Sequence, residues 1–559
     1  MLGRDLPSWE VTTLAGDVAV QRAVQRAVTR EGDDRDEIGR SGFAERARRL
    51  EADAMTDLGR LLDALHVRAD VDRWSTVSDA ATRVARIAFV RLYEAGVLSL
   101  SKAVLDTCPS CQTVLDDADA DTVEVDCELL QLDLPLTEGG SGGPVEENGS
   151  PGERDSSDGR SIEILTTAPE LLVGVVAVAV PADAAPEESY IHLPLLDAEV
   201  PIVAVEGLAK PVLVVPAHDR WSHDLARQLN YPIYQVLDGD GIVCQQGPLQ
   251  NLTRYAARVA AAEQLAAEGY ITARMKSTES VKRCYRCGTV LVPLLGSHWL
   301  LSFTDLVSPV LEEVEAGRIS FSPALAGVDF LKLAQQSGSW CVSQQLWSGQ
   351  TIPVSSCLDC GRTVVSVEEG ISCASCMGTL QPHIDVLDAR FIAAVTPLAM
   401  MGWPDSPEDP ESVVTTLSTG HLGLMTWAIP MTALAFRLAG ALPFRQIVVN
   451  EMPSEVQEPG SLQTLEAAGI VEQAGAPTAR AALIAGHLDV AQAAAGVDVM
   501  ANPAIGDVDL CAYAERIEKA LEELDAAGTL EMLIHASRSG VTPESKSMLE
   551  DLSRALLTE

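Results

Sequence analysis

Eight of the twelve cysteines lie in four Cys-x-x-Cys pairs, and no other feature of this sequence constrains the fold as strongly. Two thiolates separated by two residues can turn toward one point, and a second pair completes the tetrahedral set of sulfur ligands that zinc prefers. Four pairs therefore predict two structural zinc ions, each without an open position for a substrate. The expected ligands are Cys108 and Cys111, Cys284 and Cys287, Cys357 and Cys360, and Cys373 and Cys376.

The separations between the pairs predict two different arrangements. Residues 361–372 lie between the last two pairs and contain a β-branched run, which predicts a hairpin and a zinc ribbon over 357–376. The first two pairs are far apart, so if they share one ion, residues 112–283 form an inserted domain whose two ends the metal joins. Redox or disulfide pairing is the alternative, and a reducing cytosol disfavours it.

Length and composition indicate a multidomain protein with no membrane segment. A chain of 559 residues that is 47% hydrophobic can bury several cores, roughly three or four domains. No stretch approaches the ~18 apolar residues of a spanning helix, and the N-terminus lacks the apolar core of a signal peptide, so we expect a cytoplasmic protein. The formal net charge of -40 repels phosphate backbones and argues modestly against nucleic-acid partners.

Patterns of apolar and turn residues divide the chain into segments. Residues 17–98 carry apolar side chains at three- and four-residue spacing, which predicts helices. A stretch rich in Gly, Ser, Pro and acidic residues predicts a flexible linker over 137–160. Short β-branched runs at 162–180 and 202–215 then indicate a compact β-rich domain.

The last third of the chain is predicted to begin as an α/β unit. A strand at 446–450 follows an apolar helix at 422–438, and this order indicates part of an α/β sheet. The Ala-rich remainder at 461–559 predicts a helical C-terminal region.

Ordered segments around the cysteines carry a family resemblance that runs over about 17–450. Phe89-Val-Arg-Leu-Tyr-Glu-Ala-Gly-Val-Leu98 precedes the first pair, and the second pair continues as Cys284-Tyr-Arg-Cys287-Gly-Thr-Val. The most specific segment is Trp340-Cys-Val-Ser-Gln-Gln-Leu-Trp347-Ser-Gly349-Gln-Thr-Ile-Pro353, and Asp385-Val-Leu-Asp388 and Gly402-Trp-Pro404 follow it in order. Together they resemble class I aminoacyl-tRNA synthetases of the valine, isoleucine and leucine group, and the valyl-tRNA synthetases most closely.

The resemblance implies an α/β fold: an incomplete Rossmann-type class I synthetase core with an inserted β-rich, editing-like domain, two zinc knuckle modules and a C-terminal helical region. The expected domains are the residual first half of the core at 1–107, the first zinc module at 108–136 with 284–298, the linker at 137–160, the editing-like domain at 161–283, the second half of the core at 299–450 with its ribbon at 357–376, and the helical region at 451–559.

The motifs that carry the family's chemistry do not occur in this sequence. Adenylate formation needs positive charge at the phosphates, which the family supplies through a His-x-Gly-His motif and a Lys-Met-Ser-Lys-Ser loop. No two of the nine histidines stand three residues apart, and no lysine occurs between Leu333 and Glu518. Arg390 stands where the family has Trp after an Asp-Thr pair, and His421 stands where it has Asp. We therefore predict no catalytic residues and no ATP cofactor.

The resemblance also marks a degenerate editing pocket. Its matching residues are Thr166 and Thr167 on one segment and His218 and Asp219 on another. The family's Arg and Thr after the threonines are replaced, and Ser222 stands where the family's second Asp holds the substrate amino group. We interpret the four matching residues as framework, since burial and hydrogen bonding also suit them.

The predicted function is that of a catalytically inactive, valyl-tRNA synthetase-like protein that acts as a binding or scaffold component. The expected partner is another protein, tRNA is a weaker candidate, and no membrane is involved. The alternative is residual valine–tRNA ligase activity, or hydrolysis of mischarged tRNA in trans, with a partner chain that completes the nucleotide-binding half.

Overall fold

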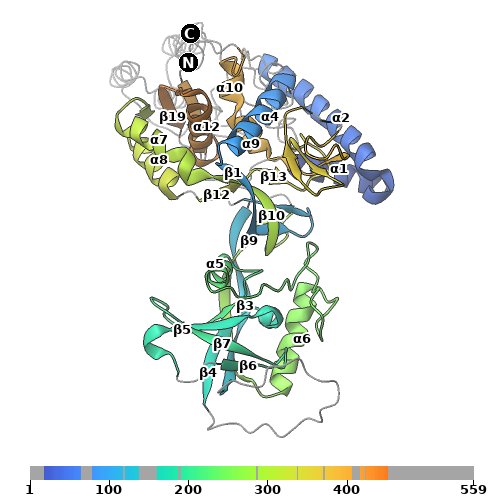
Figure 1. Ribbon diagram of the computed structural model, residues 1–559, viewed down its shortest axis with the longest axis vertical. Helices are drawn as coiled ribbons and strands as arrows, with labels where there is room; N and C mark the ends of the chain where they lie inside the picture. The colour runs from blue at the N-terminus through green and yellow to red at the C-terminus, as the bar shows by residue number, and fades with distance from the viewer. Residues whose placement is uncertain are drawn as a thin grey trace, which may run out of the picture.

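The computed structural model describes residues 18–64, 78–116, 120–137, 160–186, 190–284, 287–336, 338–368, 370, 372–405, 416–421 and 423–450. The described chain forms two lobes joined by long antiparallel strands (Figure 1). The linker expected at 137–160, apart from its two end residues, and the helical region expected at 451–559 lie outside the described residues.

Helices make up the N-terminal part of the larger lobe, as predicted. They are α1 (Val18–Glu31), α2 (Arg35–Ala64) and α4 (Asp79–Glu94). Helix α1 buries Val20, Val24 and Val28, whose four-residue spacing places them on one face. Ser78 caps the N-terminus of α4, and its side chain accepts a hydrogen bond from the backbone N–H of Ala81.

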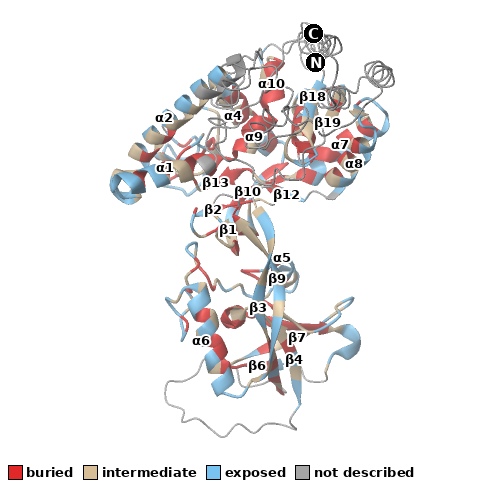
Figure 2. Ribbon diagram, turned by 180° about the vertical axis from the view of Figure 1, so that it is seen from behind, coloured by how far each residue is buried: buried red, intermediate tan, exposed pale blue. Residues whose placement is uncertain are grey.

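Two antiparallel ladders connect the lobes. Strand β1 (Leu98–Cys108) pairs with β10 (Val292–Ser302), and β2 (Thr113–Val114) and β12 (Ser339–Cys341) flank them in the order β12-β10-β1-β2. Strand β3 (Ala120–Thr137) pairs with β9 (Ile271–Cys284) from Ala120 opposite Cys284 onward. The two ladders bring segments far apart in sequence to one joint, and much of the β3–β9 ladder is solvent-exposed (Figure 2).

The smaller lobe is the predicted β-rich insert. Its sheet has the order β4-β3-β6-β7-β5-β8, and β9 pairs with β3 outside this path. Residues 120–136, expected within the first zinc module, form most of strand β3, which runs from that module into this sheet. The remaining elements are β4 (Ser161–Thr166), η2 (Pro169–Gly174), β5 (Ala177–Pro181), η3 (Ala182–Ala184), β6 (Tyr190–Leu193), β7 (Ala198–Val205), β8 (Val212–Val214), α5 (Arg220–Gln228) and α6 (Arg254–Ala267).

Alternation of apolar side chains explains how the insert packs. Leu130, Leu132 and Leu134 lie two residues apart on β3, so they share one face of the sheet, and all three are buried. The buried face of α6, with Ala257, Ala261 and Leu265, belongs to the same core. The insert therefore has its own hydrophobic core, separate from that of the larger lobe.

The predicted α/β unit completes the larger lobe. Its parallel sheet has the order β11-β19-β18, and the expected strand at 446–450 is β19. The expected helix at 422–438 begins with a π-helical turn, η4, and continues as α12. The elements are α7 (Phe303–Glu315), β11 (Ser320–Ser322), α8 (Leu325–Gln336), α9 (Ala389–Ala394), α10 (Thr396–Met400), β18 (Thr416–Gly420), η4 (Leu424–Ala428), α12 (Ile429–Ala439) and β19 (Gln446–Asn450).

A small ribbon carries the last two cysteine pairs. Its strands β14 (Val354–Cys357), β15 (Thr363–Val365) and β16 (Leu380–Pro382) have the order β15-β14-β16. The strand expected in a hairpin at 361–372 exists as β15. It pairs with β14, on the other side of the turn that carries Cys357 and Cys360. Strands β13 (Ser343–Gln344) and β17 (Val386–Leu387) pair where the ribbon joins the core. Among the helices described, none is long and apolar enough to cross a bilayer.

Candidate functional site

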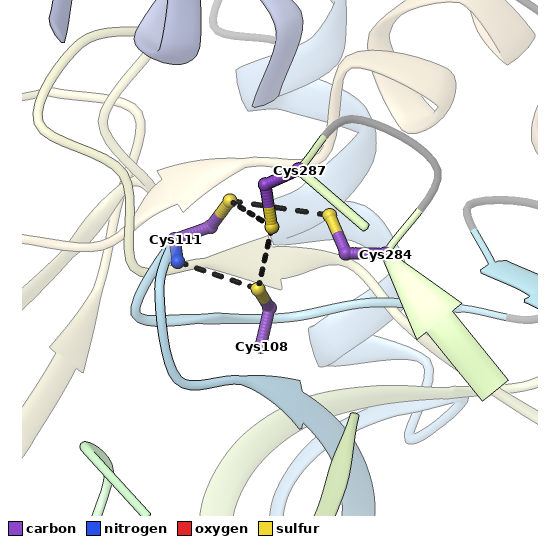
Figure 3. Close-up of side chains that lie close together, drawn as sticks. All are labelled: Cys108, Cys111, Cys284 and Cys287. Atoms are coloured by element: carbon purple, nitrogen blue, oxygen red, sulfur yellow. Dashed lines mark hydrogen bonds between the residues drawn. The ribbon is translucent and has the colours of Figure 1, made fainter. Parts of the chain in front are cut away.

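The first two cysteine pairs, distant in sequence, meet at the joint between the lobes. The four Sγ atoms point toward one another (Figure 3). Sγ distances are 3.5 Å between Cys108 and Cys287, 3.9 Å between Cys111 and Cys284, and 3.8 Å between Cys111 and Cys287. A tetrahedral zinc ion with Zn–S bonds of about 2.3 Å separates its sulfur ligands by about 3.8 Å. The donor set and its dimensions therefore fit zinc.

The ladders and two tight turns build this cluster. Each knuckle closes with a backbone hydrogen bond, from Gln112 to the Cys108 carbonyl at 2.7 Å and from Gly288 to the Cys284 carbonyl at 2.8 Å. Strand β1 ends at Cys108, and β9 ends at Cys284. The predicted closure of the insert at its two ends is thus present in the fold.

The thiols of this first cluster perturb one another strongly. The pKa of Cys111 is raised because hydrogen bonding with Cys108 and the other two sulfurs opposes its ionisation. The pKa of Cys287 is lowered because the thiols of Cys108, Cys111 and Cys284 hydrogen-bond to its thiolate. A bound divalent cation would favour all four thiolates together.

The last two cysteine pairs form a second cluster on the ribbon. Sγ distances are 3.4 Å between Cys357 and Cys376 and 3.9 Å between Cys360 and Cys373. Hydrogen bonds from the backbone N–H groups of Ser375 and Cys376 lower the pKa of Cys373 to about 6. In both clusters the four ligand atoms lie within 4.8 Å of one another, so each can hold one metal ion.

His218 is a buried, neutral support between the insert and the joint. Its Nδ1 donates to the carbonyl of Pro293 at 2.9 Å, and its Nε2 accepts from the backbone N–H of Val236 at 3.0 Å. These partners select the neutral tautomer that carries its proton on Nδ1. Burial lowers the pKa of His218 to about 4, so the ring is uncharged at neutral pH.

The other three matching residues lie at the edges of elements. Asp219 precedes α5, and its carboxylate accepts from the backbone N–H of Ser222 at 2.7 Å. Thr166 ends β4, and its hydroxyl accepts from the backbone N–H of Ala168 at 3.1 Å. Within the described part of the chain, no hydrogen bond or ion pair joins Thr166 or Thr167 to the His218–Asp219 segment. Ser222 is only 1% exposed, so little of it is open to a ligand.

A buried ion cluster beside this segment was missed by the sequence reasoning. The Glu170 side chain is fully buried and pairs with Arg254 at 3.2 Å and Arg258 at 2.8 Å. The two arginines stand four residues apart on α6, so they face the same side. That spacing was visible in the sequence, but nothing local connected it with a glutamate 84 residues away.

Comparison with known proteins gives this geometry a family. Residues 6–457 match the model of the class I tRNA synthetases for I, L, M and V. This chain belongs to that family. A valine–tRNA ligase of Clostridium tetani is 29% identical over 503 residues, covering 86% of this chain and 54% of the ligase. A valine–tRNA ligase of Thermotoga maritima is 30% identical over 450 residues, covering 78% of this chain and 50% of the ligase.

This synthetase-family chain spans about half the length of those curated relatives. A solved methionyl-tRNA synthetase of Mycobacterium tuberculosis resembles it at 10% identity and a TM-score of 0.42, covering 97% of this chain and 87% of that one. The LeuRS of Agrobacterium radiobacter K84 gives 13% identity and a TM-score of 0.41, covering 96% and 75%.

One substitution relative to the synthetases has a clear structural setting. The Arg390 guanidinium pairs with Asp388 at 3.0 Å and with Asp116 at 3.3 Å. Asp388 is almost fully buried, begins α9 and accepts a hydrogen bond from the Trp340 indole at 3.2 Å. Arg390, which stands where the sequence resemblance places a tryptophan, therefore neutralises a buried carboxylate and links α9 to the segment after the first cysteine cluster.

Proposed function

We propose that this valyl-tRNA synthetase-like chain does not activate valine and works as a binding component, with another protein as its partner. One observation carries the proposal: no lysine occurs between Leu333 and Glu518. This interval includes the stretch directly after β19, where the family resemblance places a lysine-rich loop. Without those cations the charge that develops on the phosphates during adenylate formation has no matching stabilisation there.

Two other substitutions support loss of the adenylate chemistry. Arg390 is held between two carboxylates, so its charge is already neutralised by the protein. His421, in place of the family's Asp, lies within 3.3 Å of Asp329 on the surface. ATP is for these reasons not part of the proposed function, and the net charge of -40 makes tRNA a weaker candidate partner than a protein.

The insert fits a framework role better than a hydrolytic one. Both ring nitrogens of His218 hydrogen-bond to backbone groups, and an Asp219 carboxylate oxygen accepts from a backbone N–H at the start of α5. The His218 ring therefore has no nitrogen left to orient water or a substrate amine, and one of the two Asp219 oxygens is engaged at the start of α5. The two cysteine clusters are proposed to hold structural zinc, and eight clustered thiols require a reducing compartment, which supports a cytoplasmic location.

Valine-dependent exchange of pyrophosphate with ATP tests the central proposal. The full chain is expected to give no exchange above a blank, while the Thermotoga maritima valine–tRNA ligase, assayed in parallel, gives a strong signal. Exchange by this chain that depends on valine and rises with protein concentration would overturn the proposal. Deacylation of mischarged valine tRNA is expected to stay at the spontaneous rate, and faster release would favour the hydrolytic alternative.

The binding role needs a separate test. Affinity capture of the tagged chain from native lysate, with copurifying protein and RNA both identified, is expected to enrich a protein in stoichiometric amount. Specific enrichment of valine tRNA, resistant to competing bulk RNA, would replace the protein-partner proposal with tRNA binding.

A further inference from the structure

The first cysteine cluster is contacted by parts of the chain that hold none of its ligands. Gln21 of α1 is 1% exposed, and its side-chain amide donates to the carbonyl of Cys111 at 3.1 Å. The carbonyl oxygen of the same amide accepts from the backbone N–H of Trp347 at 2.7 Å. Val18, at the start of α1, packs directly in the apolar cluster around Cys108 and Cys111. Helix α1 is thus fixed to the knuckle and to the core by one buried side chain.

Gln112, the residue after the first knuckle, reaches two other parts of the molecule. Its side-chain N–H donates to Asp240 of the insert at 2.7 Å, and its side-chain oxygen accepts from Arg35 of α2 at 2.8 Å. The Arg35 guanidinium also lies 4.4 Å from the centre of the Trp347 ring. Gln112 therefore joins the insert loop at 238–241, helix α2 and the core through a single amide.

The position of Gln112 depends on the closed knuckle. Its φ is 57°, in the left-handed region that non-glycine residues seldom adopt, and its backbone N–H is bonded to the Cys108 carbonyl. The knuckle imposes that conformation, because an open chain would relax to a negative φ. The Cys108 and Cys111 sulfurs lie within 3.9 Å of Cys284 or Cys287, at the dimensions of a zinc site, so a shared metal ion would tie this knuckle closed against the opposite pair.

From these contacts we infer that the first cysteine cluster is a metal-dependent lock that fixes two appendages of the core at once, the α1–α2 helical pair and the β-rich insert. Metal binding closes the knuckle and aims Gln112 at both Asp240 and Arg35. The Cys111 carbonyl is then presented to Gln21. Loss of the metal loosens the contacts that Gln112 and the Cys111 carbonyl make with both appendages, because these contacts share one turn of chain. This inference rests on the metal proposed for the first cluster and not on the proposed loss of valine activation.

Amide hydrogen exchange on the full chain, before and after removal of zinc by a chelator, tests the lock. Exchange in α1, in the first turns of α2 and at 238–243 is expected to speed up about tenfold or more, while α12 stays protected. Unchanged exchange in all three segments after measured loss of the metal would overturn the inference. The Cys360→Ser variant, which disrupts only the ribbon cluster, serves as the control and should leave the three segments protected.

Two variants keep the inference testable if the chelated protein unfolds as a whole. Gln112→Gly accepts the positive φ but removes the amide, so it should retain both metals and still expose α2 and the 238–243 loop to exchange. Gln21→Ala should retain both metals and loosen α1 alone. The matched control is Gln131→Ala. It removes a side-chain amide that donates to Glu163 on β4 of the insert, away from the cysteine cluster. Wild-type protection in both Gln112→Gly and Gln21→Ala would show that these amides carry no coupling.

Discussion

Glu170 shows how much of the insert depends on one residue. Its side chain is fully buried, and two guanidinium groups on α6 supply its only described charge partners. Such a cluster stabilises little relative to an apolar core, but removing one member leaves the others without compensation. Removal of Glu170 is therefore expected to destabilise the insert by more than the intact ion cluster stabilises it.

Replacing Glu170 with alanine is expected to destabilise the insert by about 3–5 kcal/mol, because two partly buried arginines then repel each other. Thermal or urea unfolding of the full chain, with amide hydrogen exchange in α6 as the readout, measures the effect. Glu163→Ala, which removes an exposed glutamate on strand β4 of the insert, should change stability by less than about 0.5 kcal/mol. Equal effects of the two variants would contradict the role of the cluster.

His218 should make the stability of the insert depend on pH. Its pKa is lowered to about 4 in the fold, so between about pH 6.5 and pH 4 the unfolded chain binds a proton that the folded chain does not. The stability that His218 supports is complete above about pH 6.5 and is lost as pH falls toward 4, up to about 3 kcal/mol. Urea unfolding measures this loss: the difference in free energy of unfolding between the wild type and His218→Gln should become smaller as the pH falls from about 6.5 to 4.

The control for this pH dependence is His421→Gln, since His421 is exposed and lies in the larger lobe. Between pH 7 and pH 4, the free energy of unfolding of His421→Gln should change with pH as that of the wild type does. If the gap between wild type and His218→Gln is constant across the same range, the buried neutral ring does not explain the acid sensitivity.

At the scale of elements, the cysteine knuckles were the most predictable parts of the molecule. Spacing fixes which sulfurs can converge, so the grouping of all eight could be read from the sequence alone. The pairing partner of β15 could not, because a β-branched run gives a strand but not its neighbour. For the same reason β3 was assigned to the zinc module, although it continues into the sheet of the insert.

Metal content should follow the two clusters independently. The wild-type chain is expected to hold about two zinc ions, and Cys111→Ser or Cys360→Ser about one each, because serine is a poor ligand for zinc. Elemental analysis after gel filtration measures the ratio. Cys244→Ser, which removes an exposed cysteine outside both clusters, should retain the full content. A wild-type level of zinc in Cys111→Ser would refute the four-thiolate site at the joint.

At the scale of the whole molecule, side chains as well as strands hold the two lobes together. Asp106 of β1 is largely buried and contacts Lys282 of β9 at 2.9 Å and Arg220 of α5 at 3.4 Å. His218 adds its bond to Pro293 of β10. None of these contacts could be predicted from the sequence, since each joins residues at least 75 positions apart whose meeting depends on the finished fold.

Loss of the Asp106 carboxylate is expected to widen the range of angles that the two lobes adopt relative to each other. In Asp106→Ala, Lys282 and Arg220 lose their shared anion, so small-angle X-ray scattering should show a broader distribution of distances than in the wild type. The matched control is Asp405→Ala, which breaks an exposed pair with Arg83 inside the larger lobe and should leave the distribution unchanged. Identical scattering from both variants would mean that the ladders alone set the angle.

The antiparallel register of β3 and β9 has a consequence for how such a chain can be rearranged. Ala120 lies directly opposite Cys284, so the polypeptide leaves the larger lobe and returns to it through neighbouring backbones about 5 Å apart. A stretch bounded in this way behaves as a cassette: recombination can lengthen it, exchange it or excise it without moving either end. A tight turn in place of residues 121–283 would close the same gap, and the synthetase-like body could then be studied free of its appendage.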